Sequence, residues 1–225
     1  MAKGMDEQGK RFEDLWARVE ADAAPVEPLD SPWRRSLVLL FWSALSLVVV
    51  LLSFGLREDC STLGIGLSWL PSFVALALAY LLFVLAGRES IPGAGIRPLP
   101  AILWSLAACG IHLAISHLTY KQSPNSVPPE QAGQMHTMCV MATLAIGAPL
   151  ILLGVRIAHS GLLIRPWVAG LLTGVSAGVV ADAVWRLHCP YTGPEHFFLA
   201  HTGPYAALIV FGLLVLRRRS APEAR

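Results

Sequence analysis

The feature that most constrains this chain is a series of six apolar runs, each about as long as a lipid bilayer is thick. The first, residues 36–56, contains no charged side chain. A helix rises about 1.5 Å per residue, so a run of this length crosses the ~30 Å hydrocarbon layer. Similar runs follow at residues 67–86, 99–118, 135–155, 167–187 and 200–216. The sequence therefore predicts an all-α polytopic membrane protein with six transmembrane helices.

The composition agrees with this prediction. Of the 225 residues, 55% are hydrophobic and only 14% are charged, and the mean hydropathy is +0.58. Such a chain has too little polar surface to enclose an ordinary soluble core. The first run is not expected to be a cleavable signal peptide, because the segment before it is long and acidic and no small-x-small cleavage site follows it.

The placement of basic residues indicates which ends of the helices face the cytoplasm. Of the 17 Lys and Arg residues, 14 lie before residue 36, after residue 216, or in the second and fourth connections. The first, third and fifth connections contain only Arg57, Lys121 and Arg186. Since basic residues are retained on the cytoplasmic side, we expect both termini in the cytoplasm and these three connections outside.

The chain divides into a tail of residues 1–35, a membrane domain of residues 36–216 and a short basic end of residues 217–225. Apolar residues in the tail recur on one helix face over about residues 10–21, which predicts an amphipathic helix. They are Phe12, Leu15, Trp16 and Val19. A helix of about a dozen residues is marginal alone in water. Its apolar face therefore needs a partner, which could be the membrane domain itself, lipid headgroups or a cytosolic protein.

Two thiols near the outer ends of consecutive helices are the candidate reactive residues. Cys139 lies one turn inside the fourth run, and Cys189 lies just beyond the fifth. Consecutive antiparallel helices with a short connection are usually neighbours, so we expect the two cysteines at similar depth. Three outcomes remain open: a disulfide, a metal site completed by His136 and His188, or two packed thiols that never meet. The pattern does not require a cofactor, and Cys109 is interpreted as a packing residue.

The fifth run carries a row of small and then charged residues. Gly170, Gly174 and Gly178 recur every four residues, a spacing that lets helices approach closely in lipid. Asp182 and Arg186 continue the same row. An acid inside a membrane is costly unless it is paired, so the sequence predicts an ion pair, either inside the bundle or at its outer surface.

Several classes of function find no support in the sequence. No metalloprotease, serine-hydrolase or phosphate-loop motif occurs, so we predict no enzyme, and topology accounts for the basic residues without direct nucleic-acid binding. Two alternatives remain. A small metal-handling permease would use Asp182 and Arg186, and a haem-binding membrane protein would need His112 and His136 as axial ligands.

Four motifs accompany the six apolar runs. They are the tail segment ADAAPVEPL at residues 21–29, Pro32-Trp33-Arg34-Arg35, Cys139 and Leu187-His188-Cys189-Pro190. With these motifs, the pattern as a whole resembles the NrsF-type membrane anti-sigma factors. The chain also resembles CarR, the light-response regulator of carotenoid synthesis genes, which is another six-span anti-sigma factor of this size.

This resemblance implies a function. Members of that family hold an extracytoplasmic-function sigma factor at the bacterial inner membrane until a stress signal releases it. Carried over to this chain, Cys139 and Cys189 would be the sensing pair and the tail would bind the sigma factor. The implied signal is an oxidant, a metal, or light acting through singlet oxygen.

Overall fold

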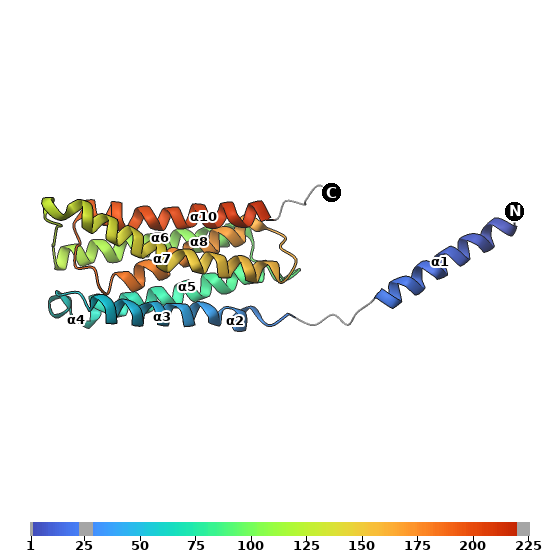
Figure 1. The fold of residues 1–225 in the computed structure, drawn as a ribbon, viewed down its shortest axis with the longest axis horizontal. Helices are drawn as coiled ribbons and strands as arrows, with labels where there is room; N and C mark the ends of the chain where they lie inside the picture. The colour runs from blue at the N-terminus through green and yellow to red at the C-terminus, as the bar shows by residue number, and fades with distance from the viewer. Residues whose placement is uncertain (1, 23–28, 220–225) are drawn as a thin grey trace.

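The computed structural model describes residues 2–22 and 29–219, and this part of the chain contains helices and no strand. The predicted tail and basic end extend over residues 23–28 and 220–225, which lie outside the described residues. Figure 1 shows a bundle of long helices with α1 (Ala2–Asp22) lying apart from it. The other helices are α2 (Pro32–Arg35), α3 (Leu37–Phe54), α4 (Cys60–Ser68), α5 (Leu70–Arg88), α6 (Pro98–Gln122), η1 (Pro129–Gln131), α7 (Ala132–His159), α8 (Pro166–Trp185), α9 (Pro194–His196), η2 (Phe197–Thr202) and α10 (Gly203–Arg219).

Six helical stretches of the described chain are long and apolar enough to cross a membrane, as predicted. They are Pro32–Phe54, Cys60–Arg88, Pro98–Gln122, Pro129–His159, Pro166–Trp185 and Pro194–Arg218. The second contains α4 and α5, which meet at Trp69. Inside α4 the backbone departs from helical geometry at Gly64, where φ is 61°. The sixth begins at Pro194, earlier than the apolar run, so its first turns belong to the end of the bundle rather than to a loop.

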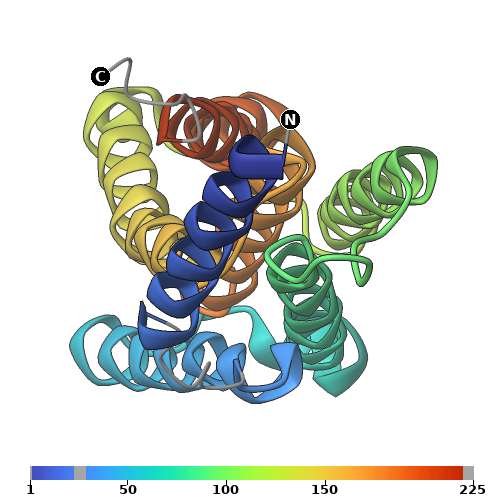
Figure 2. The same ribbon diagram turned by 90° about the vertical axis from the view of Figure 1, so that its right-hand side faces the viewer.

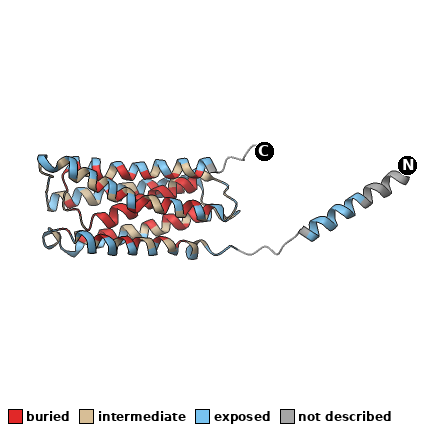
Figure 3. Ribbon diagram, viewed as in Figure 1, coloured by how far each residue is buried: buried red, intermediate tan, exposed pale blue. Residues whose placement is uncertain are grey.

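Helix α8 lies at the centre of the bundle (Figures 2 and 3). In its most apolar stretch 89% of the residues are buried by protein, against 22% for the stretches in α3 and α6. It packs against α3, α5, α6, α7 and α10. A helix that is apolar on all sides is expected to be surrounded by other helices. The outer helices instead expose large apolar side chains, as is normal for surfaces that face lipid tails.

The predicted glycine row of α8 faces α10. A Cβ atom added to Gly174 would lie 2.7 Å from the Cα atom of Ile209, and one added to Gly212 would lie 2.7 Å from the carbonyl oxygen of Gly170. Gly178 lies against the ring of Tyr205. Backbones at this distance leave no room for a methyl group, so glycine sets the separation between the two helices.

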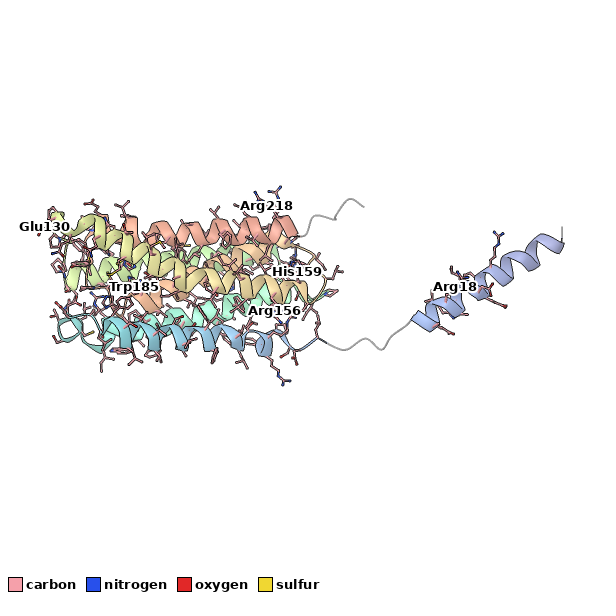
Figure 4. The ribbon with its side chains drawn as sticks, in the orientation of Figure 1. Arg18, Glu130, Arg156, His159, Trp185 and Arg218 are labelled. Carbon is pink, nitrogen blue, oxygen red and sulfur yellow. The ribbon has the colours of Figure 1, made fainter. Side chains whose placement is uncertain are left out.

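The two ends of the bundle carry different residues. Arg156, His159 and Arg218 lie at the end nearer to α1, and Glu130 lies at the opposite end (Figure 4). We call these the terminal end and the distal end. The connections that the sequence predicts to be cytoplasmic lie at the terminal end, and Cys139 and Cys189 lie toward the distal end. The side of the membrane that each end faces stays a prediction from the basic residues.

Substituting Gly174 by alanine should destabilise the bundle, because the added methyl group must push α8 and α10 apart. Overpacking of this kind typically costs about 1–3 kcal/mol. The control is Gly110→Ala in α6, where nothing lies within 4 Å of the added Cβ atom. This control should leave stability unchanged or raise it by about 0.5–1 kcal/mol through helix propensity. Thermal unfolding of both variants in detergent checks the difference, and equal midpoints would contradict the packing role of the row.

Candidate functional site

A buried carboxylate, Asp182, organises a polar cluster in the distal half of the bundle. Its Oδ1 atom accepts a hydrogen bond from Nδ1 of His201, and its Oδ2 atom accepts one from Nδ1 of His112, both at 3.0 Å. Arg186, one turn further along α8, donates to the same Oδ2 atom. Asp182 is only 4% exposed, so these three partners compensate the cost of removing its charge from water.

The two predicted thiols meet beside this carboxylate. The Sγ atoms of Cys139 and Cys189 lie 3.7 Å apart, and both residues are buried. Two histidines complete the group: Nε2 of His196 lies 3.3 Å from the Cys189 sulfur, and His201 joins from the other side. One donor atom from each of the four residues lies within 4.8 Å of every other. We call this group the Cys-His cluster.

Three separate elements bring the Cys-His cluster together. Cys139 comes from α7, and Cys189 comes from the turn after α8, where its backbone N–H donates to the carbonyl of Trp185 at 3.0 Å. Pro190 then directs the chain away from the helix. The chain returns at α9 and continues as η2, a π-helical turn, which carries His201. Turns of this kind are rare and frequently lie at functional sites.

A second ion pair, between Arg57 and Asp59, lies at the distal end of the bundle. Arg57, from the first connection, is buried and donates to both carboxylate oxygens of Asp59, at 2.5 and 2.8 Å. Ser123 donates to Asp59 at 2.6 Å, and Arg57 also reaches the carbonyl of Arg186 at 3.4 Å. Burial alone would raise the pKa of Asp59, but the hydrogen bonds from Arg57 and Ser123 bring this pKa below its ordinary value. The first, third and fifth connections are therefore tied together.

The two histidines of the predicted metal site, His136 and His188, lie outside the Cys-His cluster. His188 faces away from the cluster, with Nδ1 3.2 Å from the carbonyl oxygen of Gly55. His136 lies behind His196, and the centres of their rings are 5.0 Å apart. The prediction chose histidines close to the cysteines in sequence, but His188 is adjacent to Cys189 and so points in a different direction. His196 and His201 take their places in the cluster.

The other sequence-predicted residues have defined positions. Both ring nitrogens of His112 are engaged, by Asp182 and by Thr202 at 3.3 Å, so His112 has no free nitrogen for a haem iron. Cys109 lies 3.8 Å from the hydroxyl of Tyr205, and Cys60 is partly exposed in α4. Asp182 is held by three partners, which favours a fixed structural role over a carboxylate in a permeation path.

Comparison with known proteins gives two matches. Residues 20–219 match the family described as "NrsF: Negative regulator of sigma F". The chain is also 26% identical over 213 residues to the "Probable anti-sigma-F factor NrsF" of Azospira oryzae (strain ATCC BAA-33 / DSM 13638 / PS), and the match covers 92% of this chain and 99% of that protein. No solved structure matches. Both matches agree with the family that the sequence motifs predicted.

Removing the Asp182 carboxylate should be far more costly than removing an exposed one. Asp182→Ala leaves Arg186 buried without its anion, and breaking such a pair typically costs about 3–5 kcal/mol. The matched control is Asp30→Ala, because Asp30 forms a pair of the same spacing with Arg34, and both side chains are more than half exposed. The control should cost less than about 1 kcal/mol. Denaturant unfolding in detergent compares the two, and equal losses would contradict the organising role of Asp182.

Proposed function

Because the chain belongs to the family of negative regulators of sigma F, we propose that it is an anti-sigma factor of the bacterial inner membrane. The N-terminal tail holds an extracytoplasmic-function sigma factor, and a stress signal at the Cys139 and Cys189 pair releases it. Both termini lie in the cytoplasm, so the tail meets the sigma factor there and the thiols face the other compartment. The observation that carries the proposal is an unpartnered apolar helix face on a chain whose buried thiols meet toward the distal end.

Helix α1 offers the surface that the tail requires. Its apolar residues occupy one face, and their exposed fractions lie between 53% and 68%. They are Phe12, Leu15, Trp16 and Val19. Exposed apolar residues gathered on one helix face are typical of a helix that binds in a hydrophobic groove. Figure 1 shows α1 apart from the bundle, so the face is open to a partner in this arrangement.

Helix α7 supports a connection between the thiols and the tail. It carries Cys139 near its distal end, and about 27 Å further along, the carbonyl of Ile157 accepts a hydrogen bond from Arg35. Arg35 lies where the tail enters the bundle and also donates to Ser90 at 3.1 Å. Midway, Nε1 of Trp42 in α3 donates to the carbonyl of Ile146 at 2.8 Å. A shift of α7 therefore moves the hydrogen-bond partner of Arg35, at the point where the tail joins the bundle.

The coupling free energy that this connection must carry between the thiols and the tail is small. Bonding, metallating or oxidising the two thiols alters how α7 sits against the turn after α8. A coupling free energy of about 1–3 kcal/mol changes occupancy of a distant site 5- to 150-fold. The protein therefore needs only a small shift of packed helices, and no large rearrangement, to change how much sigma factor it holds.

The first test concerns capture of the sigma factor. Leu15→Glu and Trp16→Ala should each reduce capture about tenfold or more, because burying such a side chain contributes roughly 1.5–3 kcal/mol. The measurement is co-purification of the bound sigma factor with the membrane protein, together with expression of the genes that the sigma factor controls. These genes should be switched on without any signal.

The matched control places the same charge on the other side of α1. Ala17 is exposed and lies away from the apolar face, so Ala17→Glu should capture the sigma factor like the wild type. All three variants should remain in the membrane at wild-type levels. Capture that survives Leu15→Glu, or is lost equally in Ala17→Glu, would refute the apolar face as the binding surface.

The second test concerns release. Cys139→Ser and Cys189→Ser should each abolish release by an added oxidant or metal and leave capture intact, because one thiol cannot act without the other. The double variant should be no worse than either single one, as expected for residues that act as a unit. Cys109→Ser, whose thiol lies elsewhere in the bundle, should behave like the wild type. Partial and additive effects of the two single variants would show that the thiols do not form one sensor.

A further inference from the structure

The Cys-His cluster has the composition of a closed zinc site. Cys139, Cys189, His196 and His201 are all buried, and their donor atoms lie within 4.8 Å of one another. Two thiolates and two imidazoles in a tetrahedron are a ligand set that selects zinc. Two thiolates also balance the charge of Zn²⁺, so the complex adds no net charge to a buried position.

The distances agree with a tetrahedral ion. Two sulfurs that each bind zinc at about 2.3 Å lie about 3.8 Å apart, and a sulfur and a nitrogen lie about 3.6 Å apart. The Cys139 and Cys189 sulfurs are 3.7 Å apart, and the Cys189 sulfur is 3.3 Å from Nε2 of His196. The sulfur separation is far longer than the ~2.05 Å of a disulfide bond.

The orientation of His201 points to the same conclusion. Its Nδ1 atom donates to Asp182, which leaves Nε2 as the ring nitrogen available to a ligand in the cluster. Histidines that bind metals almost always donate their other ring N–H to a carboxylate or carbonyl, which fixes the ring and makes the ligating nitrogen more basic. Asp182 is itself held by His112 and Arg186, so it is a firm support for this ring.

The π-helical turn explains how His196 and His201 both reach the cluster. His196 and His201 are five residues apart, and in an ordinary α-helix such residues point about 140° away from each other. The i to i+5 geometry of η2 instead brings residues at this spacing toward the same side. Nδ1 of His196 is buried and has no hydrogen-bond partner among the described residues. Its other ring nitrogen, Nε2, is the one that faces the Cys189 sulfur.

An ion can approach the cluster from the distal end. A small cavity of about 30 Å³ is lined by Asp182, Cys189 and His201 among others. A wider surface hollow of about 530 Å³ is lined by His196 and by the acidic residue Glu195. Negative charge at such an opening attracts cations.

We propose that Cys139, Cys189, His196 and His201 bind one Zn²⁺ ion in a tetrahedral site, with Asp182 positioning His201. Zinc binding replaces the two thiol protons, which leave to solvent. The ion joins α7 to the turn after α8 and to η2. The meaning of this site for regulation rests on the proposed function, because these are the elements whose arrangement the signal must change.

The test uses the full-length protein, purified in detergent, reduced and stripped of metal with a chelator. Added Zn²⁺ should bind at one ion per chain, and Co²⁺ in its place should give the intense visible bands of a tetrahedral site together with thiolate-to-metal charge-transfer absorption. Cys139→Ser, Cys189→Ser and His201→Ala should each weaken Zn²⁺ binding at least 100-fold. Asp182→Asn should weaken it about 10- to 100-fold while preserving the tetrahedral spectrum.

His136→Ala and His188→Ala are matched controls, because both histidines lie close to the cluster but outside the ligand set. They should bind Zn²⁺ like the wild type. His201→Cys guards against simple misfolding, since it should keep one ion per chain and increase the charge-transfer absorption by a third thiolate. An octahedral Co²⁺ spectrum, Zn²⁺ binding that survives loss of both cysteines, or an equal loss in His136→Ala would overturn the site.

The two proposals can fail separately. If cysteine-dependent release of the sigma factor persists in a protein that binds no Zn²⁺, the zinc site is wrong and the proposed function stands. If one Zn²⁺ binds as described but the tail captures no sigma factor, the site stands and the proposed function is wrong.

Discussion

The interaction on which the rest of this structure depends is the burial of the Asp182 carboxylate inside a helical bundle. A lone charge at this position would cost several kcal/mol, so the surrounding elements must supply partners for it. They do so from three directions: His112 from α6, Arg186 from the C-terminal cap of α8 and His201 from η2. One carboxylate therefore fixes the positions of three elements near the distal end. It also orients the imidazole that faces the two thiols.

This arrangement is available only because α8 can lie at the centre. Small residues along the helix allow its neighbours to approach, and at Gly174 the backbone of α10 leaves no space for a methyl group. A central helix has neighbours on every side, so an acid on it can be reached from several other helices at once. The glycine row and Asp182 therefore depend on each other. The glycines pack α8 closely toward the terminal end, and the same helix carries the Asp182 carboxylate toward the distal end.

Much of this could be predicted from the sequence. The six helical stretches follow from apolar length, and the pairing of Asp182 with Arg186 follows from their spacing of one helical turn. The approach of Cys139 to Cys189 follows from a short connection between antiparallel helices. Each of these inferences depends only on the regular geometry of a helix and on the order of elements along the chain.

The remaining parts depend on irregular backbone, which periodicity does not describe. His196 and His201 lie on either side of residue 200, where the apolar run begins, whereas the helical stretch begins at Pro194 and contains a π-helical turn. That turn changes which residues share a face. A pair of histidines five residues apart, just after a proline, is the one local signal of it. The sequence also could not identify α10 as the helix that packs against the glycine row, because a small-residue pattern predicts a close contact but not which helix makes it.

The position of the thiols relative to the tail gives the fold its regulatory potential. Cys139 lies on α7, whose other end contacts the root of the tail through Arg35, whereas Cys189 lies on the turn after the buried and tightly packed α8. Chemistry that joins the two sulfurs therefore acts between an element held on all sides and one that lies nearer the surface. Because α8 is surrounded, the proposed function requires α7 to be the helix that moves. In the proposed function, a local bond near the distal end displaces α7 along its length, and the hydrogen bonds from Trp42 and Arg35 carry that displacement to the start of the first membrane stretch.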